Sequence, residues 1–180
     1  MSRQQLLEQL SNYSSEYSEE LSFVPRFLSL LQAPNCFERS LLTGHITASA
    51  WVTDGNLETA LLMHHMKLDR WLQPGGHADG DENTLDVAQK ELMEETGLQT
   101  FHLANDGIFD LDIHTIPLRK NIPEHDHYDI RYHFIAEKPS EIVGNNESLG
   151  LKWIKMDEIP GLVGDEQSIL RMVEKTALQK

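Results

Sequence analysis

The stretch that runs from Gly75-Gly76-His77 to Glu91-Leu92-Met93-Glu94-Glu95-Thr96-Gly97-Leu98 combines acids, glycines and apolar residues at mutually consistent spacings. It predicts a loop that leads into one helix. Asn83 or Thr84 is suited to cap the start of this helix, and Gly97 stands where a left-handed residue would end it. The apolar residues that recur at helical spacing, and so predict the inward stripe, are Leu85, Ala88 and Leu92.

Three glutamates of the predicted helix share a neighbouring face, because Glu91, Glu94 and Glu95 stand at positions i, i+3 and i+4. Like charges at these spacings weaken a helix by roughly a few tenths of a kcal/mol per pair. A bound cation would remove that repulsion. Hard carboxylate oxygens suit Mg²⁺ or Mn²⁺, so the spacing indicates a divalent metal site.

The same stretch resembles the signature box of the Nudix hydrolases, which cleave nucleoside diphosphates linked to another moiety. The match consists of Gly76, five residues, Glu82, seven residues, and then Lys90-Glu91-Leu92-Met93-Glu94-Glu95-Thr96-Gly97-Leu98. It departs at one position, since Lys90 stands where the family usually has arginine. Arginine holds a carboxylate with a planar fork, so Lys90 is expected to orient Glu91 less rigidly.

The resemblance implies a role for each residue of the box. Glu91, Glu94 and Glu95 are expected to hold Mg²⁺ or Mn²⁺, and the backbone carbonyl of Gly75 is expected to add a ligand. Glu91 or a loop glutamate is the candidate base that activates water, and Lys90 belongs with these catalytic residues. Together they would hydrolyse a phosphoanhydride bond, as in a nucleotide sugar, a dinucleotide or a nucleoside triphosphate.

Supporting positions follow from the same resemblance. Glu82 is expected to brace the loop against the helix, and Gly76 and Gly97 to provide the turns on either side. The family often supplies a further acid from a loop near the last strand. Glu147 is the first choice for that metal ligand, and Glu124 is the second.

Length and composition predict one globular domain. The chain has 180 residues, of which 39% are hydrophobic and 24% are charged. We expect a Nudix core over residues 44–180, preceded by a helical extension over residues 1–35. This extension is expected to pack on the core, and a dimer surface or a lid is the alternative. The sequence leaves a monomer and a homodimer open.

Charge and cysteine content narrow the possible partners and compartments. The formal net charge of −14 disfavours polymeric nucleic acid, whereas a small, nucleotide-derived phosphorylated substrate is compatible through divalent ions. No apolar run approaches a membrane span, and the N-terminus lacks the features of a signal peptide. The single cysteine, Cys36, agrees with a reducing compartment, so we expect a cytoplasmic protein that does not bind membranes.

The order of predicted elements is that of an α/β protein. Two helices are expected within residues 2–32, and a hairpin is expected from the strand 44–53, the turn Asp54-Gly55-Asn56 and a strand within 57–66. Residues 67–73 are expected to lead into a tight loop at Pro74-Gly75-Gly76. The later elements are strands within 107–117, 127–134 and 151–156, a loop over 145–148, and a helix over 165–178. This order, together with the resemblance, predicts a Nudix-like α/β/α sandwich with a mixed β-sheet and an N-terminal helical segment.

Two of these strands alternate strictly between apolar and polar residues. If they pair, their polar faces align into a patch of acids, histidines and one arginine. A solvated surface is the commoner reason for such alternation, but this histidine content is unusual for ordinary surface. We therefore predict that Arg131, His125 and His127 contact the substrate phosphates.

Three other readings of the sequence are weighed. A Nudix-like regulator that binds a nucleotide without catalysis commonly has an eroded box, whereas the acids here are intact. A diphosphate isomerase would need a reactive cysteine, and Cys36 lies outside any comparable motif. Asp79, Asp81 and Asn83 mimic the start of a calcium loop, but Thr84 and Lys90 occupy the positions where that loop needs glycine and glutamate.

Overall fold

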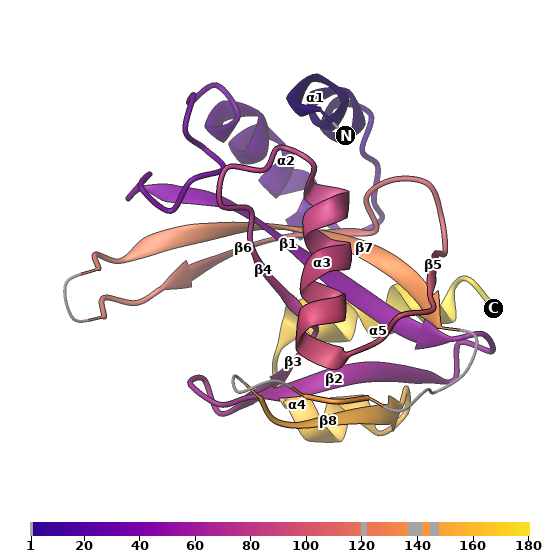
Figure 1. The fold of residues 1–180 in the computed structure, drawn as a ribbon. Helices are drawn as coiled ribbons and strands as arrows, with labels where there is room; N and C mark the ends of the chain where they lie inside the picture. Colours follow the sequence, from indigo (N-terminus) through magenta and orange to yellow (C-terminus); the bar gives the residue numbers. More distant parts are fainter. Residues whose placement is uncertain (1, 120–121, 137–141, 145–147) are drawn as a thin grey trace. The chain divides into compact units, whose positions relative to one another are not determined.

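A computed structural model describes residues 2–119, 122–136, 142–144 and 148–180 of the chain (Figure 1). The helices are α1 (Arg3–Ser11), α2 (Ser18–Leu30), α3 (Thr84–Thr96), α4 (Ile159–Val163) and α5 (Gln167–Ala177). The strands are β1 (Gly44–Asp54), β2 (Thr59–His65), β3 (Arg70–Leu72), β4 (Gly75–His77), β5 (His102–Leu103), β6 (Asp110–Ile116), β7 (His125–Ala136) and β8 (Ser148–Lys155).

The chain forms two compact units that alternate along the sequence. Unit 1 contains Met1–Ser49, Gly76–Ala88 and Gly107–Tyr132, and unit 2 contains Ala50–Gly75, Gln89–Asp106 and His133–Lys180. Four of the five unit boundaries therefore fall inside β1, β4, α3 and β7, and the fifth follows Asp106. The expectation of one domain over residues 1–180 stays a prediction.

The strands are hydrogen-bonded in the order β3-β2-β1-β7-β5, while β4 pairs with β1, β6 with β7, and β8 with β2. The predicted hairpin is confirmed, because β1 and β2 are antiparallel with Thr53 opposite Ala60. Its second strand begins at Thr59 rather than at Leu57, since Leu57 has a φ of 59° and belongs to the turn. Asp54 stabilises this turn, as its Oδ1 accepts a hydrogen bond of 2.7 Å from the Glu58 amide.

The predicted tight loop at Pro74-Gly75-Gly76 is wrong in part, because Gly75 and Gly76 belong to β4, and β3 was not predicted in the residues that lead into it. Asp69 has a φ of 53° and reverses the chain, and β3 then pairs antiparallel with β2 through His64 and Trp71. Just before β4, the Pro74 carbonyl accepts a hydrogen bond of 2.9 Å from the amide of Ala50. Strands of three residues are too short to carry a recognisable alternation. The short elements β5 and α4 were not predicted either.

The N-terminal helices are confirmed as α1 and α2, and they belong to unit 1. They lie side by side in Figure 1, and Leu6, Leu10 and Phe27 are fully buried. The Phe27 ring packs edge-on against Tyr128 of β7, with 5.3 Å between the ring centroids. The buried Glu20 accepts a hydrogen bond of 3.0 Å from the Leu111 amide in β6. This packing agrees with the expectation that the segment packs on the core, and the alternatives of a dimer surface or a lid stay untested.

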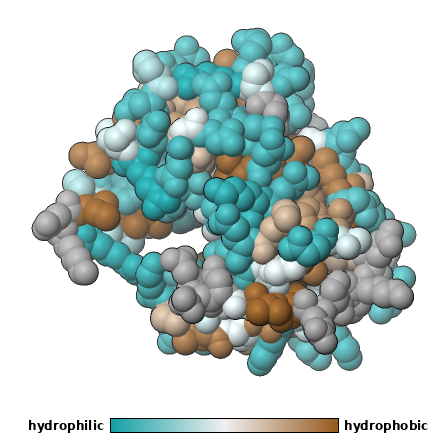
Figure 2. All heavy atoms as spheres, viewed as in Figure 1, coloured by the Kyte–Doolittle hydropathy of each residue, from teal (hydrophilic) through white to brown (hydrophobic). Residues whose placement is uncertain are grey.

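The closing helix is also confirmed, as α5, and it packs within unit 2. Ile169 and Met172 are fully buried, and Trp51 donates a hydrogen bond of 2.9 Å from Nε1 to the Thr176 hydroxyl. Among the described residues, no helix is both long enough and apolar enough to cross a membrane. Hydrophilic side chains dominate the face seen in Figure 2, in keeping with the acidic composition.

Candidate functional site

Helix α3 begins and ends as its sequence predicts. The Asn83 side chain caps it, since Oδ1 accepts a hydrogen bond of 3.4 Å from the amide of Asp86. Thr84, the alternative cap, instead bonds the Tyr132 hydroxyl at 2.7 Å. Gly97 has a φ of 72°, which is the left-handed conformation expected after the last turn. The frame of the predicted metal site is therefore a well-bounded helix.

The glutamate set, Glu91, Glu94 and Glu95, spans a range of exposure along α3. Glu95 is only 5% exposed, Glu91 is half-buried, and the Glu94 side chain is 58% exposed. Oε2 of Glu95 accepts a hydrogen bond of 2.9 Å from the amide of Gly75. The structure thus brings the predicted ligand residues Gly75 and Glu95 together and attaches β4 to the helix.

Lys90, the departure from the family pattern, lies on the exposed side of α3. Its Nζ is 3.8 Å from Oε1 of Glu94, and the two side chains are 69% and 58% exposed. An ion pair of this length and exposure contributes little, because solvent screens it. The expected weak orientation of Glu91 by Lys90 stays a prediction.

The described contacts of Glu82 differ from the expected one, and its role as a brace of the loop stays a prediction. We expected it to hold the loop against α3, whereas its described partner is Arg3 of α1. The Arg3 guanidinium Nη2 lies 2.9 Å from Oε1 of Glu82, and the Arg3 amide donates to Oε2 at 3.3 Å. Arg3 also donates to the Pro34 carbonyl at 2.8 Å. The N-terminal helix is therefore attached to the box loop.

The other acids of the predicted site fall in different places. Glu147 lies outside the described residues, and its expected role as a metal ligand stays a prediction. Glu124, the second choice, is exposed just before β7. Asp79, which mimics the start of a calcium loop, forms a bidentate ion pair with Arg39. Nε and Nη2 of Arg39 donate to the two carboxylate oxygens, each at 2.6 Å. The bond to Arg39 holds the pKa of Asp79 below its ordinary value.

The two alternating strands pair with each other, with Asp110 opposite Arg131 and His114 opposite His127, so their polar faces align. Arg131 is 2% exposed, so its environment is the interior rather than a solvated surface. Its guanidinium donates to three aspartates: to Asp129 at 2.8 Å, to Asp110 at 3.1 Å and to Asp112 at 3.0 Å. Burial opposes the charge of Arg131, but the three carboxylates outweigh burial and raise its pKa above the ordinary value.

This network favours a structural role for Arg131. Every guanidinium nitrogen already donates to a carboxylate, and the Ser49 hydroxyl adds a hydrogen bond of 2.8 Å to Asp129. A substrate phosphate would have to displace those buried carboxylates. The predicted contact of Arg131 with phosphate stays untested.

The two predicted histidines lie on β7 in different settings. Nδ1 of His125 is 2.8 Å from the Pro123 carbonyl, and the ring is half-buried. His127 is more enclosed, and its Nε2 is buried with no hydrogen-bond partner among the described residues. Burial, together with the neighbouring histidines, lowers the pKa of His127 to about 2. His127 is therefore neutral at physiological pH and would contact a phosphate as a neutral group.

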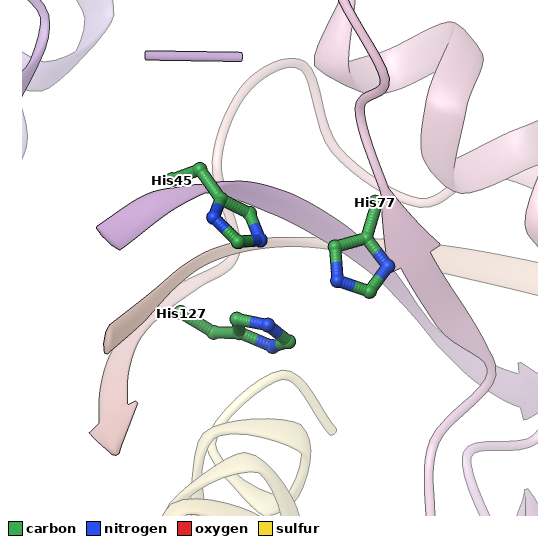
Figure 3. Close-up of side chains that lie close together, drawn as sticks. All are labelled: His45, His77 and His127. Atoms are coloured by element: carbon green, nitrogen blue, oxygen red, sulfur yellow. The ribbon is translucent and has the colours of Figure 1, made fainter. Parts of the chain in front are cut away.

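His127 belongs to a histidine cluster that sequence reasoning missed. Its other members are His45 at the start of β1 and His77 at the end of β4, and the three rings point toward one another (Figure 3). Their candidate ligand nitrogens all lie within 4.8 Å of one another. Burial lowers the pKa of His77 to about 4 and also lowers the pKa of His45. Side chains alternate along a strand, so His45 and Ser49 lie on the same face of β1. This alternation is the signal by which the sequence could have placed His45.

The predicted site residues thus fall into two groups. The glutamate set and Gly75 belong to unit 2, whereas Arg131, His125 and His127 belong to unit 1. The first group offers carboxylate oxygens, which suit a hard divalent cation. The second offers a buried ion network and imidazole nitrogens.

Comparison with known proteins identifies the family. Residues 43–173 match the NUDIX domain family. A hydrolase of the NUDIX family from Clostridium perfringens is similar in structure, with a TM-score of 0.56, 25% identity, and coverage of 76% of this chain and 98% of that chain. A comparison with curated proteins finds no match.

Two further solved structures share the fold at lower identity. An Ap4A hydrolase from C. elegans, in a binary complex, has a TM-score of 0.58 and 14% identity, and covers 74% of this chain and 96% of its own. The dihydroneopterin triphosphate pyrophosphohydrolase of E. coli has a TM-score of 0.58 and 13% identity, with coverage of 75% and 96%.

These findings confirm the predicted fold class, a mixed sheet with helices and an N-terminal helical segment. The family match includes α3 and its glutamate set, the features on which the resemblance rested. The chain belongs to the Nudix family and is a Nudix-type pyrophosphohydrolase.

Proposed function

We propose that this protein hydrolyses a phosphoanhydride bond in a nucleoside diphosphate linked to another moiety, with Mg²⁺ or Mn²⁺ held by the glutamate set and Gly75. Substrates of this class include nucleotide sugars, dinucleotides and nucleoside triphosphates. The observation that carries the proposal is the hydrogen bond from the Gly75 amide to the buried Glu95 carboxylate, at 2.9 Å. It attaches the loop that supplies a backbone ligand to the helix that supplies the carboxylates.

The donor set fits a hard divalent cation. Three carboxylates at i, i+3 and i+4 offer oxygen ligands on one side of α3, and like charges so close together repel without a cation. One oxygen of Glu95 accepts a hydrogen bond from the Gly75 amide, which orients the carboxylate. A bound divalent ion would draw charge from the phosphoryl oxygens and make a nearby water more acidic.

Each glutamate of the set is assigned a separate role in the reaction. Glu95 is held in place by burial and by the Gly75 amide, so we assign it to positioning and ligation. Glu94 is exposed and can reach a hydrated ion, and the half-buried Glu91 is the candidate base that accepts the proton of the attacking water. Lys90 lies beside Glu94 on the exposed side of α3.

The alternative of a diphosphate isomerase receives no support from Cys36. That residue is fully buried, and burial raises the pKa of its thiol above the ordinary value. A buried, protonated thiol is a poor nucleophile. The buried free thiol agrees with a reducing compartment, so we propose the cytoplasm as the location.

The proposal is tested by a turnover screen with Glu94→Gln as the key variant. Nucleoside triphosphates, dinucleotides, nucleotide sugars and coenzyme A are offered to the wild type with Mg²⁺ and with Mn²⁺. On the best substrate, Glu94→Gln is expected to lose about 100-fold or more in kcat, in line with the loss of a group that stabilises charge in the transition state.

Glu8→Gln is the matched control, since Glu8 is an exposed glutamate on α1 and lies far from the box in the sequence. It is expected to retain wild-type turnover. Equal metal-dependent turnover by the wild type and Glu94→Gln would show that the glutamate set does not carry the reaction.

A further inference from the structure

We propose that the histidine cluster, His45, His77 and His127, is a second metal site that binds a zinc-class divalent cation such as Zn²⁺ or Co²⁺. The site is distinct in chemistry from the glutamate set, because its ligands are imidazole nitrogens rather than carboxylate oxygens. All three residues belong to unit 1.

Three strands place the histidines around one point. Ring centroids are separated by 5.2 Å for His45 and His77, 4.8 Å for His77 and His127, and 5.0 Å for His45 and His127. The rings therefore form a nearly equilateral triangle, and Figure 3 shows them converging from β1, β4 and β7. A strand framework holds such an arrangement more firmly than loops would.

The spacing of the nitrogens is close to that of a metal site. The candidate ligand atoms lie within 4.8 Å of one another, whereas nitrogens bound to one tetrahedral zinc ion are separated by about 3.4 Å, given bonds of about 2.0–2.1 Å. Rotations about the side-chain torsions would bring the nitrogens that much closer without moving the strands.

Unpaired nitrogens provide an independent indication of a ligand. Nε2 of His45 and Nε2 of His127 are both buried and have no hydrogen-bond partner among the described residues. His45 as a whole is only 3% exposed. Buried polar atoms are rarely left unpaired, because they lose their hydration without compensation. A metal ion bound to both nitrogens would remove that cost.

The protonation state of the rings suits metal binding. Nδ1 of His45 lies 3.5 Å from the Leu41 carbonyl, which favours the proton on Nδ1 and leaves the lone pair on Nε2. Neutral imidazole is the form that binds metal.

The ligand type selects the ion. Imidazole nitrogens suit Zn²⁺ and its neighbours in the first transition row, whereas Mg²⁺ prefers hard oxygen ligands. Three neutral ligands leave the full charge of the ion in place and one tetrahedral position open for water or an anion.

The test is a Co²⁺ titration of the full chain in the presence of excess Mg²⁺, which occupies the glutamate set. Tetrahedral Co²⁺ with nitrogen ligands absorbs visible light far more strongly than Co²⁺ in an octahedral oxygen site, so the spectrum reports the histidine cluster. The wild type is expected to bind one equivalent of Co²⁺. His77→Gln and His127→Gln are expected to bind it at least tenfold more weakly.

Two controls separate this site from the proposed active site. His102→Gln removes an exposed histidine of β5, and Glu94→Gln alters the glutamate set; both are expected to keep the Co²⁺ spectrum and affinity of the wild type. A wild type without the tetrahedral spectrum, or His variants that bind Co²⁺ as tightly as the wild type, would overturn the proposal. Because binding is read without substrate, it is decided separately from hydrolysis.

Thermal melting distinguishes a variant that has lost metal binding from one that fails to fold. Zn²⁺ is expected to raise the melting temperature of the wild type and of His102→Gln, both in excess Mg²⁺. His77→Gln is expected to melt cooperatively without that rise. A wild type whose melting temperature does not respond to Zn²⁺ would count against the site even if every His variant were unfolded.

Discussion

Replacing Arg131 with methionine keeps a long apolar stem and removes the charge from the aspartate network. Asp110, Asp112 and Asp129 are 0%, 8% and 2% exposed, so the variant would hold three buried carboxylates without their cation. Removing one partner from a buried ion pair costs about 3–5 kcal/mol, and we expect a loss of unfolding free energy in this range or above it. For a domain of this size, that corresponds to a fall in Tm of roughly 6–20 °C.

The assay is urea unfolding of Arg131→Met and of Arg26→Met as the matched control. Arg26 pairs with Asp126 at 3.0 Å, but its side chain is 47% exposed, so its loss should cost less than about 1 kcal/mol. The structural reasoning would be refuted if Arg131→Met unfolded within about 1 kcal/mol of the wild type while the KM for substrate rose strongly. Such a result would restore Arg131 as a phosphate contact.

Three further predictions concern local features. Gly97→Ala should lower the unfolding free energy by about 1 kcal/mol in urea titrations, because φ is 72° there; an unchanged value would contradict the assigned helix end. Glu82→Gln, which weakens a partly exposed ion pair with Arg3, should cost less than about 1 kcal/mol in the same assay, and a larger loss would show a stronger brace. Burial lowers the pKa of His133 to about 4, below the value of 6.5 expected when unfolded, so the unfolded state binds a proton that the folded state does not. Stability should therefore fall as pH drops from about 6.5 to about 4. His133→Gln should flatten that curve relative to the exposed control His102→Gln, and identical curves would argue against the assignment.

The parts of the fold that local sequence determines were predictable. The bounds of α3 follow from Asn83, Gly97 and an apolar stripe within one short stretch, and the glutamate set follows from spacing along a single helix. The alternation predicted that the polar faces of the two strands would align if the strands paired, and they do pair, with Asp110 opposite Arg131. Each of these features depends on residues that are close in sequence or share a simple period.

Contacts between distant segments were not predictable in the same way. Glu82 binds Arg3, 79 residues away, and no local pattern distinguishes that partner from the neighbouring helix α3. His45 and His77 come from strands whose relative register the sequence does not specify, so their convergence with His127 appears only in three dimensions. Burial was not predictable either. Alternation alone does not show whether the polar face of a strand is solvated or, as at Arg131, buried.

The hydrogen bond between Glu20 and Leu111 bears on whether a strand of another chain can add to the sheet at β6. Among the strand pairings of the described residues, β6 is paired with β7 alone and is therefore an edge strand of the sheet. Such an edge invites strand addition by another chain. Glu20 of α2 accepts from the Leu111 amide and brings a buried charge to the middle of that edge. We expect this contact with α2 to hinder strand addition at Leu111.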